Sequence, residues 1–368
     1  MRLLALAGDI HALIAGIRLV GPLTALAAQM GHSLQLRSFH DCSRADLAAC
    51  DVLIVQRGAS ARVLLQQQIA RLHGAAVIYE IDDLLSEIAP HISNQAAVSR
   101  QRAWLLRCMD NADVVSVATA RLGVELGLSG AVEVPNHAFS LGDVPLPAVD
   151  TTRPVTLLLA SSDRLAAGFL YPALHELEGV QVVVVGPPGA DLEAAGLAVR
   201  RQGLLPRERF LAFARDLVNP VGVIPLEDSR FAACKSAVKW FDYAEAGIPT
   251  LCSAVSPYLM VVQDGVTGAL VANEQAAWLA ALRHAAADAA WRQRIAAAAR
   301  AAVRERHTLA HTVSAWQRVV DTALERRAPA PLPGWGWRVR EATAARLEAL
   351  ALKLRALNRA RLANRTRR

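Results

Sequence analysis

The stretch VLIVQRGASARVLLQQQIARLHGAAVIYEI (52–81) decides the fold class. It holds two short apolar runs, 52–56 and 76–81, on either side of a helix-like segment over 60–73. Runs this apolar are typical of strands buried on both faces, as in a parallel sheet that helices cover. A strand, a helix and a second strand in this order make one unit of a doubly wound α/β fold.

Apolar runs of the same kind recur in two groups along the chain. The first group is 3–8, 52–56, 76–81 and 114–119, and the second is 155–161, 180–186, 221–225 and 249–253. Further helix-like segments follow them over 95–110, 207–216 and 236–246. The segment 140–154 between the groups contains three prolines and has no hydrophobic period. We therefore expect an α/β protein of two Rossmann-like domains, with a ligand site in the cleft between them.

Composition and charge exclude several classes of function. The chain has 368 residues and a net charge of +7, but 338–368 alone hold ten Arg or Lys and two Glu, which leaves the rest at −1. A nearly neutral body lacks the basic face of a nucleic-acid-binding domain. The five cysteines are scattered and form no C-x-x-C pair. They predict reduced thiols in a cytoplasm, and no metal site. No apolar run reaches the ~20 residues of a membrane-spanning helix, so we expect a soluble chain.

The basic end of the chain has a pattern of its own. After the proline- and tryptophan-rich 329–337, four leucines fall at spacings of 3, 4 and 3 among arginines, namely Leu347, Leu350, Leu354 and Leu357. A basic amphipathic helix of this kind is typical of contact with an anionic membrane surface, here through 335–368. The alternative is a helix that docks on the body of the protein or on a partner.

A phosphate site is predicted around the helix expected over 236–246. Lys235, Lys239 and Asp242 are spaced i, i+4 and i+7, so they lie along one stripe of that helix. Lysines beside free amide groups at a helix start suit a diphosphate, and the carboxylate suits ribose hydroxyls. The alternative is a solvated face on which Lys239 pairs with Asp242.

The sequence also resembles a known family. The stretch PLEDSRFAACKSAVKWFDYAEAGIPTLCSAVSPYLMVVQDGVTGALV (225–271) is similar to the donor-binding half of the group 1 (family 4-like) GT-B glycosyltransferases, in particular those of bacterial surface-polysaccharide and O-antigen assembly. The segments 51–58, 77–85, 116–122 and 132–139 resemble the family's amino-terminal domain, and 291–308 its closing helices.

The resemblance implies a division of the chain. It predicts an acceptor domain over 1–145, a nucleotide-sugar donor domain over 153–306, and a closing helix over 307–328 that packs back on the first domain. The linker and basic tail over 329–368 lie outside the resemblance.

The resemblance also implies roles for residues of the second domain. Asp242 stands where the family has the acid that holds the donor ribose, and Cys234 stands where it has the acid that contacts the donor sugar. Of the cations expected after the first strand of this domain, only Arg164 is present. Lys235 and Lys239 are then left to stabilise the leaving diphosphate. The expected donor-binding residues are Ser161, Arg164, Gly186, Cys234, Lys235, Ser236, Lys239 and Asp242.

The first domain offers candidates at the ends of its predicted strands. Asp82 and Asp83 follow a strand directly, so we expect one to cap a helix and the other to face the cleft; a pair of ligands for a divalent ion is the rival interpretation. The residues expected to take part in catalysis are Asp82, Asp83, Lys235 and Lys239, and those expected to bind the acceptor are Asp9, His11, Arg18 and Arg57.

The function expected from these observations is transfer of a hexose from a nucleotide-sugar donor to a lipid-linked or polysaccharide acceptor. The resemblance implies that the reaction needs no metal or cofactor and retains the anomeric configuration. We expect a cytoplasmic protein, peripheral on the inner face of the membrane. The first alternative is a non-catalytic relative that acts as a sugar-binding or assembly scaffold, which Cys234 favours. A nucleotide-sugar epimerase on the same fold is the second.

Overall fold

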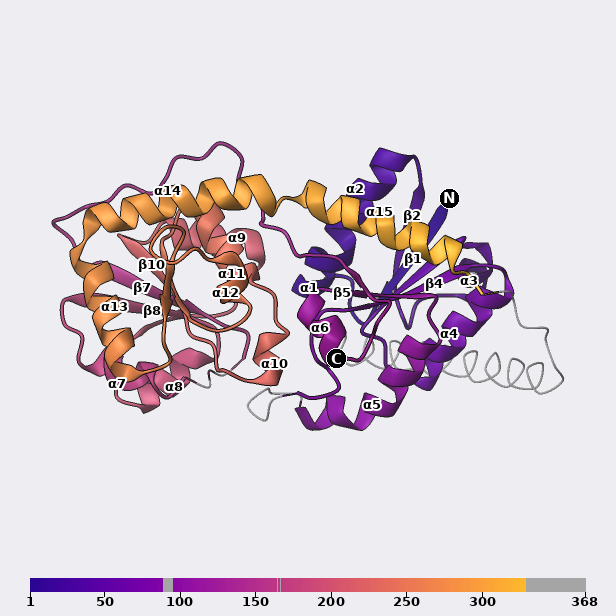
Figure 1. Cartoon of the computed structure of the whole chain (residues 1–368), viewed down its shortest axis with the longest axis horizontal. Coiled ribbons are helices and arrows are strands. Elements are labelled where there is room, and N and C mark those ends of the chain that lie inside the picture. The colour runs from indigo at the N-terminus through magenta and orange to yellow at the C-terminus, as the bar shows by residue number, and fades with distance from the viewer. Residues whose placement is uncertain (89–94, 164, 166, 329–368) are drawn as a thin grey trace, which may run out of the picture.

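The computed structural model describes residues 1–88, 95–163, 165 and 167–328. Arg164 and the whole basic tail therefore lie outside the described residues. Within them the chain forms two α/β domains, each built around a parallel sheet of six strands (Figure 1). The predicted fold class is confirmed.

The first domain contains the sheet β2-β1-β3-β4-β5-β6. Its strands are β1 (Arg2–Ala7), β2 (Ser33–Ser38), β3 (Val52–Gln56), β4 (Ala76–Ile81), β5 (Val114–Val117) and β6 (Val132–Glu133). Its helices are α1 (Leu13–Ala15), the π-helical turn η1 (Gly16–Val20), α2 (Gly21–Met30), α3 (Arg44–Ala49), α4 (Ala61–Leu72), α5 (Gln95–Asp110) and α6 (Ala120–Glu125).

The second domain contains the sheet β12-β11-β10-β7-β8-β9. Its strands are β7 (Val155–Ala160), β8 (Val180–Val185), β9 (Arg200–Gln202), β10 (Pro220–Ile224), β11 (Thr250–Ser253) and β12 (Ala269–Val271). Its helices are α7 (Leu170–His175), α8 (Pro188–Ala194), α9 (Arg207–Arg215), α10 (Arg230–Ala233), α11 (Val238–Ala246), α12 (Tyr258–Val261), α13 (Gln275–Ala287) and α14 (Ala289–Arg306).

The unit over 52–81 shows why the sequence forms these elements. Every residue of β3 and β4 is buried, and the two strands pair in parallel. The helix α4 begins after Ser60, whose side chain accepts a hydrogen bond from the backbone N–H of Val63. This cap satisfies one of the free amide groups of the helix start, and it turns the chain back over the sheet.

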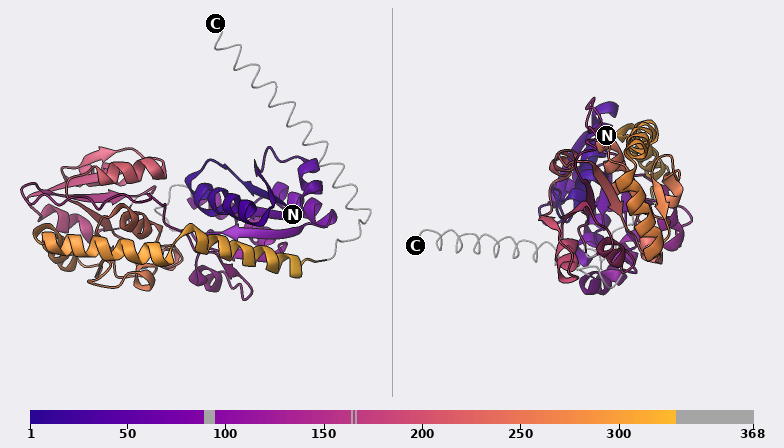
Figure 2. Two further views of the ribbon diagram at one scale, coloured as in Figure 1. Left: turned by 90° about the horizontal axis from the view of Figure 1, so that it is seen from above. Right: turned by 90° about the vertical axis from the view of Figure 1, so that its left-hand side faces the viewer.

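The chain crosses between the domains twice. It first crosses after β6, along 134–154, and it returns between α14 and α15 (Leu309–Glu325). Figures 1 and 2 show α14 along the second domain and α15 along the first. The indole of Trp316 on α15 is fully buried in the core of the first domain, and its Nε1 donates to the backbone oxygen of Arg18 at 3.0 Å.

The apolar helical segment near the amino terminus belongs to this core. Leu13–Met30 is the one helical stretch among the described residues that is long and apolar enough to cross a membrane, by length and composition alone. Its mean hydropathy is 1.5, and 44% of the stretch is buried in the fold. It packs against α15 through residues such as Leu19, Leu23 and Leu26.

Two tryptophans allow a test of this division into cores. Replacing Trp316 by Ala removes a fully buried indole from the first domain, and replacing Trp278 does the same in the second. Each loss costs about 3–5 kcal/mol. Hydrogen exchange followed by mass spectrometry should show faster exchange of β1 and β3 in Trp316→Ala, and of β7 and β10 in Trp278→Ala. Faster exchange of the second sheet in Trp316→Ala would contradict the assignment of α15 to the first core.

Candidate functional site

Two neighbouring cavities lie between the domains. The smaller has a volume of about 470 Å³ and the larger about 1080 Å³. Ala12, Leu13 and Ile17 line both, so α1 and the start of η1 form the wall between them. Both cavities receive residues that follow strands of the two sheets, which is where open α/β sheets bind ligands.

The smaller cavity, called the charged cavity below, holds charged side chains from both domains. Arg57 follows β3, and Asp82 and Asp83 follow β4. The Arg57 guanidinium binds Asp82 through two nitrogens, one of them at 2.5 Å, and donates to Asp83 at 2.8 Å. Burial alone would lower the pKa of Arg57, but the two carboxylates raise it, so the cation persists.

The expected capping role of one of these two aspartates is wrong. No helix begins within the described residues that directly follow them, 84–88, and both carboxylates are hydrogen-bond acceptors for Arg57. The described part of the chain also contains no group of three or more His, Cys, Asp or Glu that would hold a metal ion. The two aspartates at the end of β4 are therefore explained as hydrogen-bond partners of the Arg57 guanidinium.

The second domain supplies cations at the start of α11. Ser236, Lys235 and Lys239 line the charged cavity. No side chain caps this helix start. The Lys235 ammonium lies 3.8 Å from Asp83 of the other domain and 4.5 Å from the centre of the Phe231 ring. Burial, together with the charge of Lys235, lowers the pKa of Lys239 to about 8. These cations meet an uncapped helix dipole, an arrangement that favours an anion.

Hydrogen bonds join the two domains beside this helix start. Asn136, on the crossing segment, donates through Nδ2 to the Ser236 hydroxyl at 2.6 Å. The Thr119 hydroxyl donates to the backbone oxygen of Cys234 at 3.1 Å. Arg230 also pairs with Glu87 at 2.8 Å and with Glu125, both in the first domain. The charged cavity is therefore closed on one side by direct contacts between the domains.

Two residues predicted to bind ligands are core residues. Arg18 is fully buried; it pairs with Glu80 at 2.7 Å and donates to the backbone oxygen of Val134 and to Asn136. It lines neither cavity, so an acceptor has no path to it. Cys234 is also fully buried, packs against the core of the first domain, and has its pKa raised to about 11 by burial. Its predicted contact with the donor sugar is wrong.

Asp242 differs from the expectation in a more informative way. Its carboxylate accepts from Nε of Arg207 at 2.9 and 3.0 Å, and Arg207 also donates to the backbone oxygen of His137 at 2.7 Å. The alternative pairing of Asp242 with Lys239 is not formed. Burial raises the pKa of Asp242, and Arg207 opposes this shift. Asp242 lines neither cavity, whereas Arg207 lines the larger one.

The remaining predicted residues fall into two groups. Ser161 lines the charged cavity, and His11 lines the larger one. Asp9 is exposed, lines neither cavity, and accepts from the backbone N–H of His11 at 2.8 Å. Gly186 lines neither; it has φ of +97°, and a Cβ there would overlap the backbone oxygen of Ser161. Its role is to let β7 and β8 end close together.

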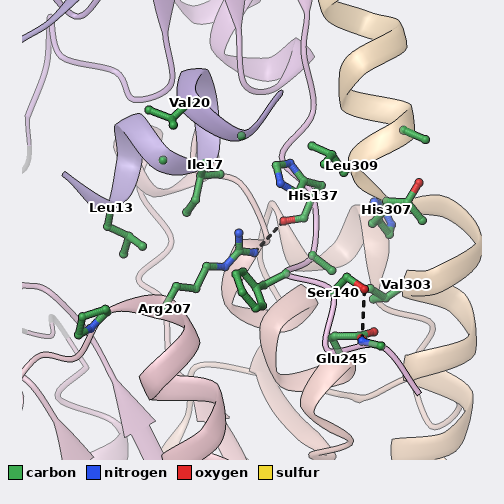
Figure 3. A pocket seen from close by; sticks show the side chains of 18 of the residues that line it. Leu13, Ile17, Val20, His137, Ser140, Arg207, Glu245, Val303, His307 and Leu309 are labelled. Carbon is green, nitrogen blue, oxygen red and sulfur yellow. Dashed lines mark hydrogen bonds between the residues drawn. The ribbon is translucent and has the colours of Figure 1, made fainter. Parts of the chain in front are cut away.

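The larger cavity is called the apolar cavity below, and of the predicted site residues only His11 lines it. Figure 3 shows Leu13, Ile17 and Val20 on one wall and Val303 and Leu309 on another, with Arg207 reaching across to His137. These apolar residues belong to helices that look like ordinary core elements in the sequence. The available signals were His11, predicted to bind the acceptor, and His137, in the stretch 132–139 that resembles the family's amino-terminal domain.

Replacing Arg57 tests how much its positive charge stabilises the carboxylates of the charged cavity. In Arg57→Leu the Asp82 carboxylate, which is 5% exposed, loses its cation. We expect a loss of about 1–3 kcal/mol in stability of the first domain at pH 7.

Thermal unfolding at pH 7 measures this effect, and Arg57→Lys is the matched control. Because Arg57→Lys keeps a cation near Asp82, its loss of stability should be smaller. Equal stability of Arg57→Leu and the wild type at pH 7 would contradict the pairing.

Comparisons with known proteins concern the fold and the second domain. Residues 164–318 match the family described as "Glycosyl transferase-like". No curated protein sequence matches the chain. Among solved structures, HepE from Anabaena in complex with UDP and glucose matches with a TM-score of 0.60 and 15% identity, covering 88% of this chain and 100% of that one. Sucrose-phosphate synthase from Thermosynechococcus elongatus matches with a TM-score of 0.63 and 17% identity, covering 94% and 99%.

A glycosyltransferase from Rickettsia africae matches with a TM-score of 0.58 and 12% identity, covering 88% of this chain and 98% of that one. At these identities the structures show a shared fold over nearly the whole described chain. Residues 164–318 are therefore similar to the glycosyl transferase-like family, and the two domains together have the fold of the GT-B glycosyltransferases.

Proposed function

We propose that the protein transfers a sugar from a nucleoside-diphosphate sugar to a lipid-linked or glycan acceptor of surface-polysaccharide assembly. The observation that carries the proposal is the set of Lys235, Ser236 and Lys239 at the uncapped start of α11, inside a cavity between the two domains. The family match and the HepE structures, which contain UDP, UDP and glucose, or UDP-glucose, support it.

The chemistry follows from the charge that develops on the donor. When the bond between the anomeric carbon and the phosphate oxygen breaks, negative charge grows on the diphosphate. Lys235, Lys239 and the amide dipoles of α11 are already in place to stabilise it. We propose that they do so without a divalent ion or a cofactor. We also propose that the anomeric configuration is retained, as in most members of the family that the sequence resembles.

The pair of Asp242 and Arg207 has a supporting role in this proposal. Asp242 sits one helical turn beyond Lys239 and is held by Arg207, which lines the neighbouring apolar cavity. Asp242 therefore orients this guanidinium in the wall beside the donor and does not contact the donor directly. The first domain brings the acceptor in this proposal: His11 lines the apolar cavity and Arg57 lines the charged cavity.

The lowered pKa of Lys239 gives a specific test of diphosphate binding. A bound diphosphate raises this pKa, so binding of UDP at pH 8.5 should draw about 0.7 of a proton from solution, because the free lysine, with a pKa of about 8, is mostly neutral there. Calorimetry in two buffers of different ionisation enthalpy measures the uptake. Lys239→Arg keeps the charge but stays protonated, so it should bind UDP with no proton uptake.

A measurement of turnover distinguishes an enzyme from a non-catalytic scaffold. The scaffold is favoured by the buried Cys234, which stands where the resembling family has the acid that contacts the donor sugar. Lys239→Ala should lower the rate of UDP release from the cognate UDP-sugar about 10²- to 10³-fold, the usual effect of losing one preorganised charge-stabilising group. Arg209→Ala is the control, because it removes one positive charge from an exposed position on α9. It should leave the rate unchanged. UDP binding without any turnover would support the scaffold.

We further propose that 335–368 bring the enzyme to the inner face of the cytoplasmic membrane. The support is the sequence alone, a net charge of +8 over 338–368 around a leucine stripe. Deleting 338–368 should move the protein from the membrane fraction to the soluble fraction and abolish its sedimentation with vesicles that contain anionic lipid. Unchanged partitioning of the shortened chain would refute this.

A further inference from the structure

We infer that the apolar cavity binds the hydrocarbon chain of a lipid-linked acceptor while the donor diphosphate occupies the charged cavity. The inference rests on the proposed function and makes it more specific, because it selects the lipid-linked acceptor over a free glycan. Of the residues predicted from the sequence to bind ligands or to take part in catalysis, only His11 lines this cavity.

The size and lining of the cavity suit a chain rather than a sugar. Its volume is about 1080 Å³, more than twice that of the charged cavity. Aliphatic side chains come from both domains, including Ile10, Leu13, Ile17, Val20, Leu204 and Leu309. Leu13 is 56% exposed and Leu204 is 60% exposed, so both present apolar area that a ligand would cover. A free glycan needs many hydrogen-bond partners, which such walls do not provide.

The charged side chains that line the cavity have partners within the protein, including the fully exposed Asp143, which lies 3.8 Å from Arg304. Arg207 is paired with Asp242. Glu245, almost fully buried, is paired with Arg304 at 2.9 Å. Burial is the main cause that lowers the pKa of both His137 and His307 to about 4, so both rings are neutral at pH 7. A neutral interior favours an uncharged occupant, in contrast to the cations of the charged cavity.

A glycine, Gly16, leaves room on the wall that the first domain provides. Gly16 and Gly21 both line the cavity, at the beginning of η1 and just after its end. A Cβ added at Gly16 would have no protein atom within 4 Å, so the space beside its backbone belongs to the cavity. Gly16 has ordinary helical dihedral angles, with φ of −57° and ψ of −48°. Helix geometry therefore does not require the glycine, and its small size keeps the cavity open.

One buried polar atom indicates the orientation of the ligand. His137 is 8% exposed and lines the cavity, and its ring Nδ1 has no hydrogen-bond partner. A single polar group of the ligand, next to the chain, would satisfy it. The wall of Ala12, Leu13 and Ile17 is shared with the charged cavity, so the chain and the donor would lie on opposite sides of one helical turn. The acceptor head group would then reach over that turn to the donor sugar.

The test uses the full chain and a series of alkyl glucosides from methyl to octyl, each below its critical micelle concentration, with and without UDP. We expect affinity, measured by calorimetry, to rise several-fold for each added pair of methylenes, because each buried methylene contributes to binding. Gly16→Phe fills the cavity and should abolish this dependence on chain length while changing the affinity for UDP by less than twofold. Gly8→Phe is the matched control: its Cβ also has no neighbour within 4 Å, but it lines neither cavity.

A second variant approaches the cavity from the opposite wall. Leu309→Gln should weaken octyl glucoside at least fivefold and leave UDP unaffected. Affinity that does not depend on chain length in the wild type would overturn the inference and leave the proposed function standing, provided that UDP binds. Loss of UDP binding in Gly16→Phe, with a normal unfolding temperature, would also overturn it, because the cavity would then hold the nucleoside. A wild type that binds octyl glucoside but no UDP would overturn the proposed function, and with it the role of the chain as part of an acceptor.

Discussion

The buried ion pair of Arg18 and Glu80 fixes the relation between the two domains. Arg18 stands on η1 and Glu80 on β4, and neither side chain has any exposed surface. The same guanidinium holds the backbone of Val134 and the side chain of Asn136, on the segment that leaves the first domain. Asn136 in turn donates to Ser236 at the start of α11. Because a buried cation without its partner is very unfavourable, this chain of bonds positions the crossing segment strictly.

The paired cavities follow from that arrangement. One is rich in cations and carboxylates, and the other is apolar with balanced charges, yet a single helical turn separates them. A donor with a charged diphosphate and an acceptor with an apolar part require two such environments side by side. In this fold each cavity is lined by residues of both domains, so neither environment has to be built within one core. This division explains why the wall residues come from the first domain and the lysines from the second.

The local pattern of the sequence was sufficient to predict the two sheets and part of the site. The runs over 52–56 and 76–81 are strands because their apolar residues leave no polar face, and strand ends in a parallel sheet meet at one edge. This is why Arg57, Asp82 and Asp83 could be expected near one another. The predicted roles of three residues were wrong because their partners are distant in sequence. Arg18 pairs with Glu80, Cys234 packs in the core that contains Cys108, and Asp242 pairs with Arg207. Spacing along one helix cannot reveal a partner on another, and burial is decided by those partners.

The return of the chain through α15 has a consequence for biosynthesis. Trp316, Val319 and Val320 complete the same core as Leu3 and Ala5, so the first domain combines the earliest and the latest of these segments. On the ribosome, the second domain emerges with all of its own strands before α15 has been made. The nascent chain therefore completes its second domain first. Meanwhile the amino-terminal sheet has an open apolar flank that chaperones would have to shield until translation passes residue 325.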